Sequence, residues 1–234
     1  MLYSKVFLRL HWGYSIRRPS VKERSAFLLP PPTTLIGALS YYKFRGIDTD
    51  IANTSTASAT YKLKNIKASA KLESPASYIE DIENQIVAPY QKRPEIKFNI
   101  IPVGKVYSPD GRLVIVYITD KITREELEKM SWGIIRIGCK ECLVSVEDVE
   151  IGEAKKVSGI MKTCYYFPAN VKVIEGRDII QYADFWDEDV YIWDRKPKLV
   201  RYALPLLSYP IKSKEVKVKA NEAYEVGGEY VVFA

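Results

Sequence analysis

The first strand-length segment of the chain alternates between two kinds of side chain. One set is aliphatic and the other is mostly charged or aromatic: Val6, Leu8 and Leu10 against Lys5, Phe7, Arg9 and His11. A period of two residues predicts a β-strand, because successive side chains point to opposite faces of a sheet. We therefore expect the aliphatic set to lie in a core and the second set to lie on an open face.

A proline-rich elbow then leads into a predicted helix. The three consecutive prolines at 30–32 lack amide N–H groups and have a fixed φ, so they cannot continue a sheet or lie inside a helix. Thr33 or Thr34 offers a hydroxyl as N-cap to a helix over about 34–44. Gly37 weakens that helix relative to alanine, which indicates that another group packs closely against it.

Two strands are predicted in the middle of the chain, over 96–107 and 112–119. Ser108–Gly111 has the Ser-Pro-Asp-Gly sequence of a turn and would join these strands as a hairpin. Residues 54–95 lack clear periodicity, and a long loop without structure is uncommon inside a compact domain. We therefore predict that 54–95 is an excursion that contains a projecting hairpin.

A second helix and a further strand complete the pattern. Thr123–Glu126 has the layout of a capping box and predicts a helix to about Ile135, and 143–149 alternates as a strand. The order strand, helix, strand, strand, helix, strand predicts an α+β fold with a ferredoxin-like (RRM-like) domain. We expect this domain to span 1–152, with a β-rich C-terminal region over 153–234 packed on it.

The charge of the chain is distributed unevenly. The 234 residues carry a net charge of +6, but residues 1–71 hold twelve lysines and arginines against three acidic residues, and the remainder carries −3. This asymmetry predicts that the N-terminal part faces a polyanion and that the near-neutral remainder is free to meet protein. For any single lysine, a solvated surface position is the alternative.

Membrane and secretory classes are disfavoured by the sequence. No apolar run approaches the ~18 residues that a membrane span requires, and Met1–Arg9 is too charged for the core of a signal peptide. The three cysteines, together with the lack of a targeting signal, indicate a reducing cytoplasm. We expect a cytoplasmic protein with no membrane partner.

Basic and aromatic residues interleave in the N-terminal part, and they are the candidate RNA-binding residues. Single-stranded RNA is bound by cations that follow its phosphates and by flat side chains that stack on its bases. Two of the candidates, Lys43 and Arg45, fall in the last turn of the predicted first helix, where complementing the helix dipole is an equal alternative. The full set is Tyr14, Arg17, Arg18, Lys22, Arg24, Lys43, Arg45, Tyr61, Lys62, Lys64, Lys67 and Lys71.

One segment of the chain resembles a known family. Pro31–Leu39 reads Pro-Pro-Thr-Thr-Leu-Ile-Gly-Ala-Leu after a first strand, and Ile137–Val146 adds a glycine turn that enters a strand. This pattern resembles the fifth CRISPR-associated (Cas) protein family, the RAMP-type subunits of type I Cascade antiviral surveillance complexes. The resemblance covers the N-terminal part most specifically.

The resemblance implies a function and a set of partners. By this resemblance the chain would bind the 5′ handle of crRNA without cutting it, although some relatives in this family cut RNA, and it would cap one end of the crRNA-bound filament. Members of this family contact the backbone subunit and the large subunit, meet target DNA only indirectly, need no cofactor, and carry a thumb-like hairpin in the region of the predicted excursion. By this resemblance we expect a non-catalytic RNA-binding subunit, and an archaeal type I-A complex is our guess for its subtype.

The cysteines and acidic residues offer two candidate metal sites. Cys139 and Cys142 have the spacing of half a zinc site, but a structural zinc needs four ligands, and Cys164 and His11 are unpaired in the sequence. We therefore predict reduced, metal-free cysteines. Asp184 with the acidic run at 187–189 is a possible cation cluster and equally a solvated turn.

Two alternatives to the RNA-binding subunit remain open. Metal-free RNA cleavage needs a group that deprotonates the 2′-hydroxyl, and His11, the only histidine, could supply it together with a Tyr and a Lys. The chain would then be an endoribonuclease that processes CRISPR repeat RNA. The second alternative is a scaffold whose basic face binds protein partners only.

Overall fold

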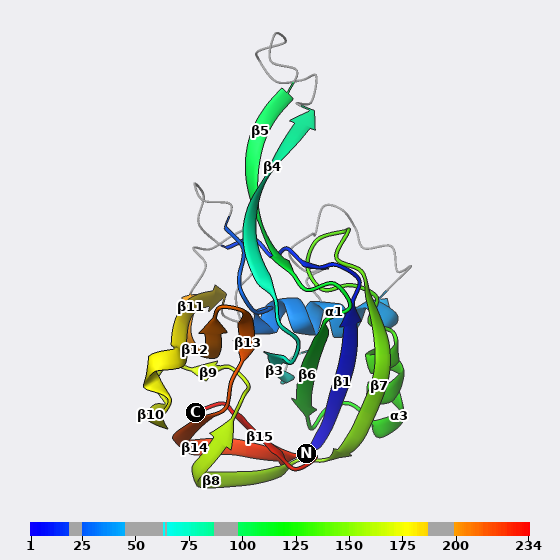
Figure 1. Ribbon diagram of the computed structural model, residues 1–234. Coiled ribbons are helices and arrows are strands. Elements are labelled where there is room, and N and C mark those ends of the chain that lie inside the picture. Colours follow the sequence, from blue (N-terminus) through cyan, green and yellow to red (C-terminus); the bar gives the residue numbers. More distant parts are fainter. Residues whose placement is uncertain (19–24, 45–62, 64, 87–97, 187–198) are drawn as a thin grey trace.

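The chain forms a two-layer α+β body from which one long β-hairpin projects (Figure 1). The computed structural model describes residues 1–18, 25–44, 63, 65–86, 98–186 and 199–234.

A four-stranded antiparallel sheet organises the N-terminal part. Its strands are β1 (Leu2–Leu10), β3 (Lys67–Leu72), β6 (Arg112–Thr119) and β7 (Val144–Glu153). Their order across the sheet is β3-β6-β1-β7, and every neighbouring pair is antiparallel. Helix α1 (Pro32–Phe44) connects β1 to β3 in the chain, and α3 (Arg124–Trp132) connects β6 to β7.

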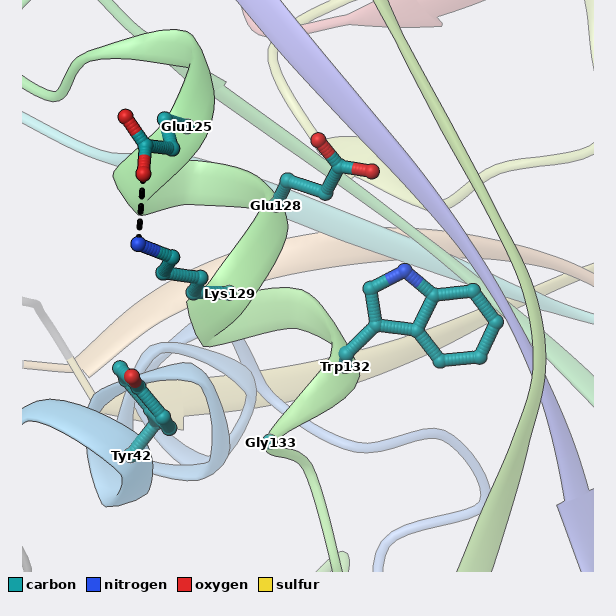
Figure 2. Close-up of a pocket in the computed structure, with 6 residues that line it drawn as sticks. All are labelled: Tyr42, Glu125, Glu128, Lys129, Trp132 and Gly133. Carbon is teal, nitrogen blue, oxygen red and sulfur yellow. Dashed lines mark hydrogen bonds and ion pairs between the residues drawn. The ribbon is translucent and has the colours of Figure 1, made fainter.

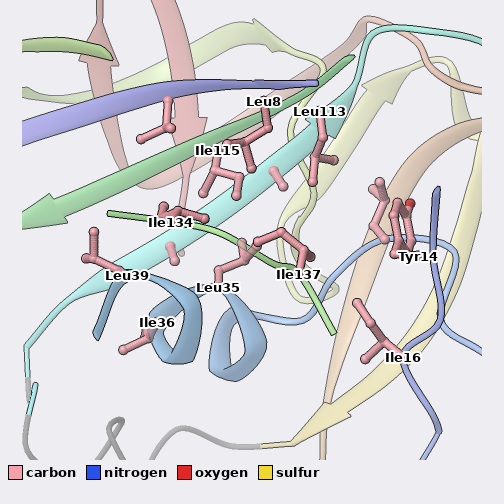
Figure 3. Close-up of a cluster of buried hydrophobic side chains, with 14 of the residues drawn as sticks. Leu8, Tyr14, Ile16, Leu35, Ile36, Leu39, Leu113, Ile115, Ile134 and Ile137 are labelled. Atoms are coloured by element: carbon pink, nitrogen blue, oxygen red, sulfur yellow. The ribbon is translucent and has the colours of Figure 1, made fainter. Parts of the chain in front are cut away.

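The aliphatic side chains of β1 lie in the core between this sheet and the helices, as predicted. Val6, Leu8 and Leu10 are fully buried, and they share the main core with Leu35 and Leu39 of α1. Figure 3 shows the α1 side chains pointing towards the sheet. The alternating pattern predicted the buried face correctly, because the folded state is most stable when the apolar side chains of a strand leave water completely.

Both predicted helices form, with shifted ends. Helix α1 begins at Pro32, before the predicted threonine caps, because a proline is well suited to the first helical position, where no N–H partner is required. Helix α3 is capped as predicted, since the Thr123 hydroxyl accepts a hydrogen bond from the Glu126 N–H at 3.3 Å. It ends at Trp132 rather than near Ile135.

The projecting hairpin consists of β4 (Ser77–Ile86) and β5 (Phe98–Tyr107), and its root pairs with β2 (Gly13–Tyr14). The predicted pairing of 96–107 with 112–119 is wrong. The Ser108–Gly111 turn forms, with the Gly111 N–H donating to the Ser108 carbonyl at 2.9 Å, but it joins strands of different sheets. Strand β6 is buried on both faces and lies between β1 and β3, a position that turn chemistry cannot reveal.

Strand β3 lies within the range that we predicted as an excursion, yet it is an edge strand of the main sheet. Of residues 54–95, those that the structure describes therefore divide between the main sheet and the projecting strand β4. The alanine and leucine side chains of β3 are buried, which places this segment in the sheet although the sequence shows no clear periodicity there.

The C-terminal part is made of strands, as predicted. They form two further sheets, one around β14 and one around β12. The elements are β8 (Lys155–Thr163), β9 (Phe167–Pro168), β10 (Lys172–Glu175), the 3-10 turn η2 (Arg177–Ile179), β11 (Ile180–Trp186), β12 (Leu199–Ser208), β13 (Ile211–Ser213), β14 (Val216–Val226) and β15 (Glu229–Val232). A two-residue turn, Gly227–Gly228, joins β14 to β15 with φ values of +55° and +78°, which glycine adopts without strain.

This C-terminal part covers much of the second face of the main sheet, which we had predicted to be open. Val114 and Val116 of β6 pack there with Tyr165, Tyr224 and Val231. Lys5 on the same face is buried, so the prediction of an open face is wrong for the middle of β1. Among the helices that the structure describes, none is long and apolar enough to span a membrane.

Candidate nucleic-acid interface

Two arginines lie side by side where the main sheet meets the root of the hairpin. Arg9 on β1 is the cross-strand partner of Arg112 on β6, and about half of each side chain is exposed. Glu147 of β7 holds both guanidinium groups: Arg9 Nε donates to one carboxylate oxygen at 2.6 Å, and Arg112 Nε donates to the other at 3.0 Å. The single negative charge of Glu147 thus neutralises only one of the two positive charges, and its carboxylate holds both guanidinium groups in place at the surface.

A second pair of arginines lies at the root of the hairpin, on the segment that follows β2. Arg17 is exposed and forms an antiparallel bridge with Ala26, and the Arg18 N–H donates to the Ser25 carbonyl at 3.0 Å. The Arg18 guanidinium lies 5.8 Å from the centre of the Phe27 ring. We call Arg9, Arg112, Arg17 and Arg18 the hairpin-root arginines.

Hydrogen bonds tie both pairs to the start of the hairpin. The Arg112 N–H donates to Ser74 Oγ at 2.9 Å, just before β4. The Ala26 N–H donates to the Tyr78 hydroxyl at 3.2 Å, on β4 itself. Burial raises the pKa of Tyr78, against a smaller opposing effect of the nearby Arg18 guanidinium. Both pairs therefore belong to segments that are hydrogen-bonded to the start of the hairpin, and exposed guanidinium groups on these segments can bind phosphates.

His11 and Trp12 lie beside this group. His11 is exposed, and its Nε2 lies 2.9 Å from Ser145 Oγ. The Trp12 ring packs on Tyr107 of the hairpin root, with 5.2 Å between ring centres, and its indole N–H donates to the Glu141 carbonyl at 2.8 Å. His11 can contact a phosphate from this position.

Two of the predicted RNA-binding residues are buried inside the chain. Tyr14 is fully buried, its hydroxyl donates to the Leu28 carbonyl at 2.6 Å, and burial strongly raises its pKa, so its ring cannot stack on a base. Lys71 is buried and paired with Glu73 and Glu229. The structure therefore corrects both predictions, since these two side chains do not reach the surface.

Lys67 and Lys43 are also paired, at the surface. The Lys67 ammonium pairs with Glu222 and lies over the rings of Tyr224 and Phe233. Lys43 lies 2.6 Å from Glu126 of α3, so its main contact holds the two helices together. The other predicted residues of this set, Lys22, Arg24, Arg45, Tyr61, Lys62 and Lys64, lie outside the described residues.

Cys139 and Cys142 are joined by a disulfide, so the prediction that they are reduced is wrong. The physical reason is the turn between them, in which the Cys142 N–H donates to the Cys139 carbonyl at 3.2 Å and the two Cα atoms lie 5.3 Å apart. Gly138, just before this turn, has a φ of +97°, and a side chain there would clash with the Ser15 carbonyl. Cys164 is free, and burial raises the pKa of its thiol.

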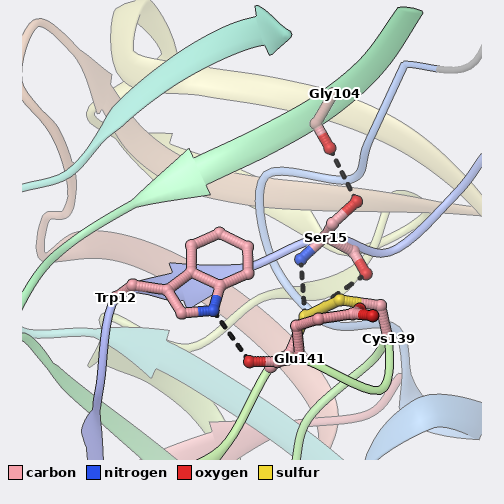
Figure 4. The surroundings of a disulfide bond; sticks show 6 residues. Trp12, Ser15, Gly104, Cys139 and Glu141 are labelled. Atoms are coloured by element: carbon pink, nitrogen blue, oxygen red, sulfur yellow. Dashed lines mark hydrogen bonds between the residues drawn. A yellow bond between two sulfur atoms is a disulfide. The ribbon is translucent and has the colours of Figure 1, made fainter. Parts of the chain in front are cut away.

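The disulfide loop fixes the segment that leads to Arg17 (Figure 4). The Ser15 N–H donates to Cys142 Sγ at 3.2 Å, and the Cys139 N–H donates to the Ser15 carbonyl at the same distance. The Ser15 hydroxyl in turn donates to the Gly104 carbonyl of β5 at 2.7 Å. Ser15 therefore connects the disulfide loop to the root of the hairpin.

Neither candidate metal site is assembled in the part of the chain that the structure describes. There, no group of three or more His, Cys, Asp or Glu side chains converges on a common point. Asp184 accepts two hydrogen bonds from Arg201, at 2.8 and 3.2 Å, and the acidic run at 187–189 lies outside the described residues.

Close relatives of the chain are CRISPR-associated proteins. It is 56% identical over 240 residues to CRISPR-associated protein Cas5 3 of Saccharolobus solfataricus and 55% identical to CRISPR system aCascade subunit Cas5 1 of the same archaeon, and in both cases the whole of each chain is covered. The chain belongs to the Cas5 family. No protein-family model matches it.

The fold of this Cas5 family member agrees with solved CRISPR proteins. A CRISPR protein from Archaeoglobus fulgidus has a TM-score of 0.67 at 20% identity, with 99% of this chain and 98% of that chain covered. A chain of a CRISPR RNA-guided surveillance complex has a TM-score of 0.52 at 10% identity, covering 93% and 91% of the two chains. At these identities, the similarity shows the fold alone.

Sequence reasoning omitted Arg9 and Arg112 from the candidate RNA-binding set. Arg9 belongs to the polar half of the alternating pattern, and its cross-strand neighbour Arg112 is more than a hundred residues away. The alternating pattern could therefore have predicted an exposed position for Arg9 but not for Arg112. Only strand register brings the two together.

Proposed function

We propose that this chain is a non-catalytic subunit of a type I CRISPR Cascade, that it binds the 5′ handle of crRNA, and that it caps the backbone filament in antiviral defence. The observation that carries this proposal is the full-length 55% identity to a protein named as an aCascade subunit. The archaeal source of that relative favours an archaeal, type I-A complex.

The hairpin-root arginines support the RNA-binding part of this proposal. Arg17, in an isolated β-bridge, and the Arg9–Arg112 pair, on neighbouring strands, present guanidinium groups to solvent, where each can bind a phosphate. Trp12 adds an aromatic surface beside them. In this proposal the handle runs across the root of the hairpin.

The architecture that we propose for residues 1–152 is the ferredoxin-like RAMP domain. The strand order β3-β6-β1-β7, with one helix after the first strand and one after the third, supports this assignment. The region over 153–234 would then be a β-rich C-terminal part that packs on it. We place the contacts with the backbone subunit and the large subunit on surfaces away from the arginines, and contact with target DNA is indirect.

A binding titration tests this proposal. Labelled 5′-handle RNA, with a scrambled RNA of equal length as control, is titrated with the protein and followed by fluorescence anisotropy over a range of salt concentrations. We expect binding that weakens linearly in log–log form as salt rises. Equal affinity for both RNAs, together with no complex with the purified backbone subunit, would contradict the proposal and favour the protein-only scaffold.

A further inference from the structure

Helix α1 has an outward face without charge. Its buried positions are Pro32, Leu35, Ile36, Leu39 and Ser40, and its other positions before Lys43 are Thr33, Thr34, Gly37, Ala38, Tyr41 and Tyr42. A helix on the surface of a soluble protein ordinarily carries charged or strongly polar side chains on the face that meets water, and a helix that lacks them is ordinarily covered. Within the described chain, Tyr41 and Tyr42 of this face are exposed and the other four residues are partly exposed.

Two adjoining hollows border this uncharged face. The larger, of about 440 Å³, lies between α1 and α3 and is lined by Tyr42, Glu125, Glu128, Lys129, Trp132 and Gly133. The smaller, of about 240 Å³, is lined by Gly37, Tyr41 and Ile135 among others, and by one cation, Arg136. Trp132 is 48% exposed and Ile135 is 42% exposed. Exposed Trp and Tyr side chains around a hollow are typical of the residues that dominate binding energy in protein interfaces.

A contact within the chain explains the glycine at position 133 but not the glycine at position 37. A methyl group at Gly133 would lie 2.6 Å from the Tyr42 Cβ, so glycine is required there for the close approach of α1 and α3. A methyl group at Gly37 would meet no atom within 4 Å. Glycine weakens a helix relative to alanine, and at position 37 no contact with another described residue accounts for it.

The charge around the larger hollow indicates the chemistry of its occupant. Glu125 is paired with Lys129 at 2.6 Å. Among the described residues, no hydrogen bond or ion pair involves the Glu128 carboxylate, which projects on the same side of α3 as Trp132 (Figure 2). Two carboxylates against one ammonium disfavour a phosphate backbone here, and a free carboxylate beside an indole ring favours a cationic side chain.

We infer that the α1–α3 face is a docking surface for another protein subunit, which places an apolar side chain against Trp132 and a lysine or arginine next to Glu128. The inference rests on the proposed membership of a multisubunit complex, and it separates the surface that binds protein from the hairpin-root arginines that bind RNA. Gly37 leaves room for the partner to approach the backbone of α1.

Three variants test this surface, with purified backbone subunit and purified large subunit as separate probes in size-exclusion and calorimetric binding assays. Gly37→Gln adds a side chain at the smaller hollow, where its Cβ meets no atom within 4 Å. Trp132→Ala removes the aromatic surface, and Glu128→Lys reverses the free charge. The matched controls are Glu153→Lys, which reverses the charge of an exposed glutamate of β7, and Tyr182→Ala, which removes an exposed aromatic residue of β11. Melting temperature and handle-RNA affinity are measured for every variant.

We expect one of the two subunits to bind the three variants about tenfold or more weakly than the parent chain, while the controls match the parent. Melting temperature and RNA affinity should stay at the parent's values, with Gly37→Gln as stable as the parent or more stable. If all three variants bind both subunits as tightly as the parent does, the inference is wrong and the proposed function is unaffected. A selective loss of RNA binding, or the conversion of a dimeric parent into a monomer, would also overturn the inference. If the parent itself binds neither subunit, the proposed function fails together with the inference.

Discussion

The ammonium group of Lys5 lies 2.9 Å from a carboxylate oxygen of Glu229, although the two residues stand near opposite ends of the chain. Lys71 pairs with the same carboxylate, and the Tyr165 hydroxyl donates to it at 2.9 Å. Lys5 and Lys71 belong to the main sheet, whereas Glu229 is the first residue of β15. One carboxylate thus joins the second face of the main sheet to the C-terminal strands.

Replacing this carboxylate should destabilise the protein. Glu229→Gln leaves two largely buried ammonium groups without their shared partner, and we expect the free energy of unfolding to fall by about 2 kcal/mol, below the full value for a buried pair because Glu229 keeps some contact with water. Urea unfolding followed by circular dichroism measures the change. The control is Glu175→Gln, since Glu175 forms an exposed pair with Lys217 and its loss should cost less than about 1 kcal/mol. Equal losses in both variants would contradict the special role of Glu229.

The same carboxylate predicts how stability depends on pH. Burial acts to raise the pKa of Glu229, but hydrogen bonds from Lys71 and Lys5 outweigh it and hold the pKa below its ordinary value of 4.5. A group whose pKa is lowered by folding stabilises the folded state above its unfolded pKa, and this contribution disappears as the pH falls through the folded pKa. The stability difference between the parent and Glu229→Gln should therefore be constant from pH 7 to about pH 5 and shrink below pH 4.5. Calorimetric melting of both proteins across this range checks it, and a difference that grows in acid would have the wrong sign.

Single arginine substitutions should identify the RNA surface. Arg17→Ala and Arg112→Ala each remove an exposed guanidinium group, and each should weaken binding of handle RNA and lower the slope of log affinity against log salt by about one. The double variant Arg17→Ala with Arg18→Ala should lose more than Arg17→Ala alone. Arg201→Ala, which removes an exposed arginine paired with Asp184 on the C-terminal strands, is the control. Unchanged affinity and slope in all the hairpin-root variants would show that this surface does not face RNA.

The cysteines should be distinguishable by alkylation. Under denaturing, non-reducing conditions, iodoacetamide should label Cys164 alone, and after reduction it should label all three cysteines. Intact-protein mass spectrometry counts the labels. We also expect Cys142→Ala to cost about 1–2 kcal/mol, more than Cys139→Ala, because Cys142 is buried and its sulfur accepts the Ser15 N–H. Three labels without reduction would refute the disulfide.

The parent chain should bind repeat RNA without cutting it. Removing the general base of a metal-independent ribonuclease should cost on the order of a hundredfold or more in rate. The His11 ring contacts Ser145. We expect both the parent and His11→Ala to leave labelled repeat RNA intact over hours without metal. The affinity of the variant for RNA should fall by no more than the loss of a single contact would cause. Denaturing gel electrophoresis reads the outcome. Cleavage at one defined site that His11→Ala abolishes would favour the endoribonuclease alternative instead.

Local sequence determined the elements that depend on neighbouring residues. The alternation of Val6, Leu8 and Leu10 identified β1 and its core face, and the hydroxyl of Thr123 marked the start of α3. Proline geometry placed the beginning of α1 within two residues. Each of these features follows from side chains a few positions apart, so a short window of sequence contains the physical cause.

Tertiary structure alone decided which strands pair and which charges face outward. The turn at Ser108–Gly111 was correctly predicted, but whether it joins paired strands depends on the burial of β6 between β1 and β3. Lys5 and Lys71 read in the sequence as surface cations, yet a carboxylate on the last strand pairs with both and allows their burial. Strand register brings Arg112 beside Arg9 and so creates a basic pair that neither local segment contains. In each case the deciding partner is distant in the chain, and a lysine or arginine is buried or exposed according to that partner because an unpaired charge is costly to remove from water.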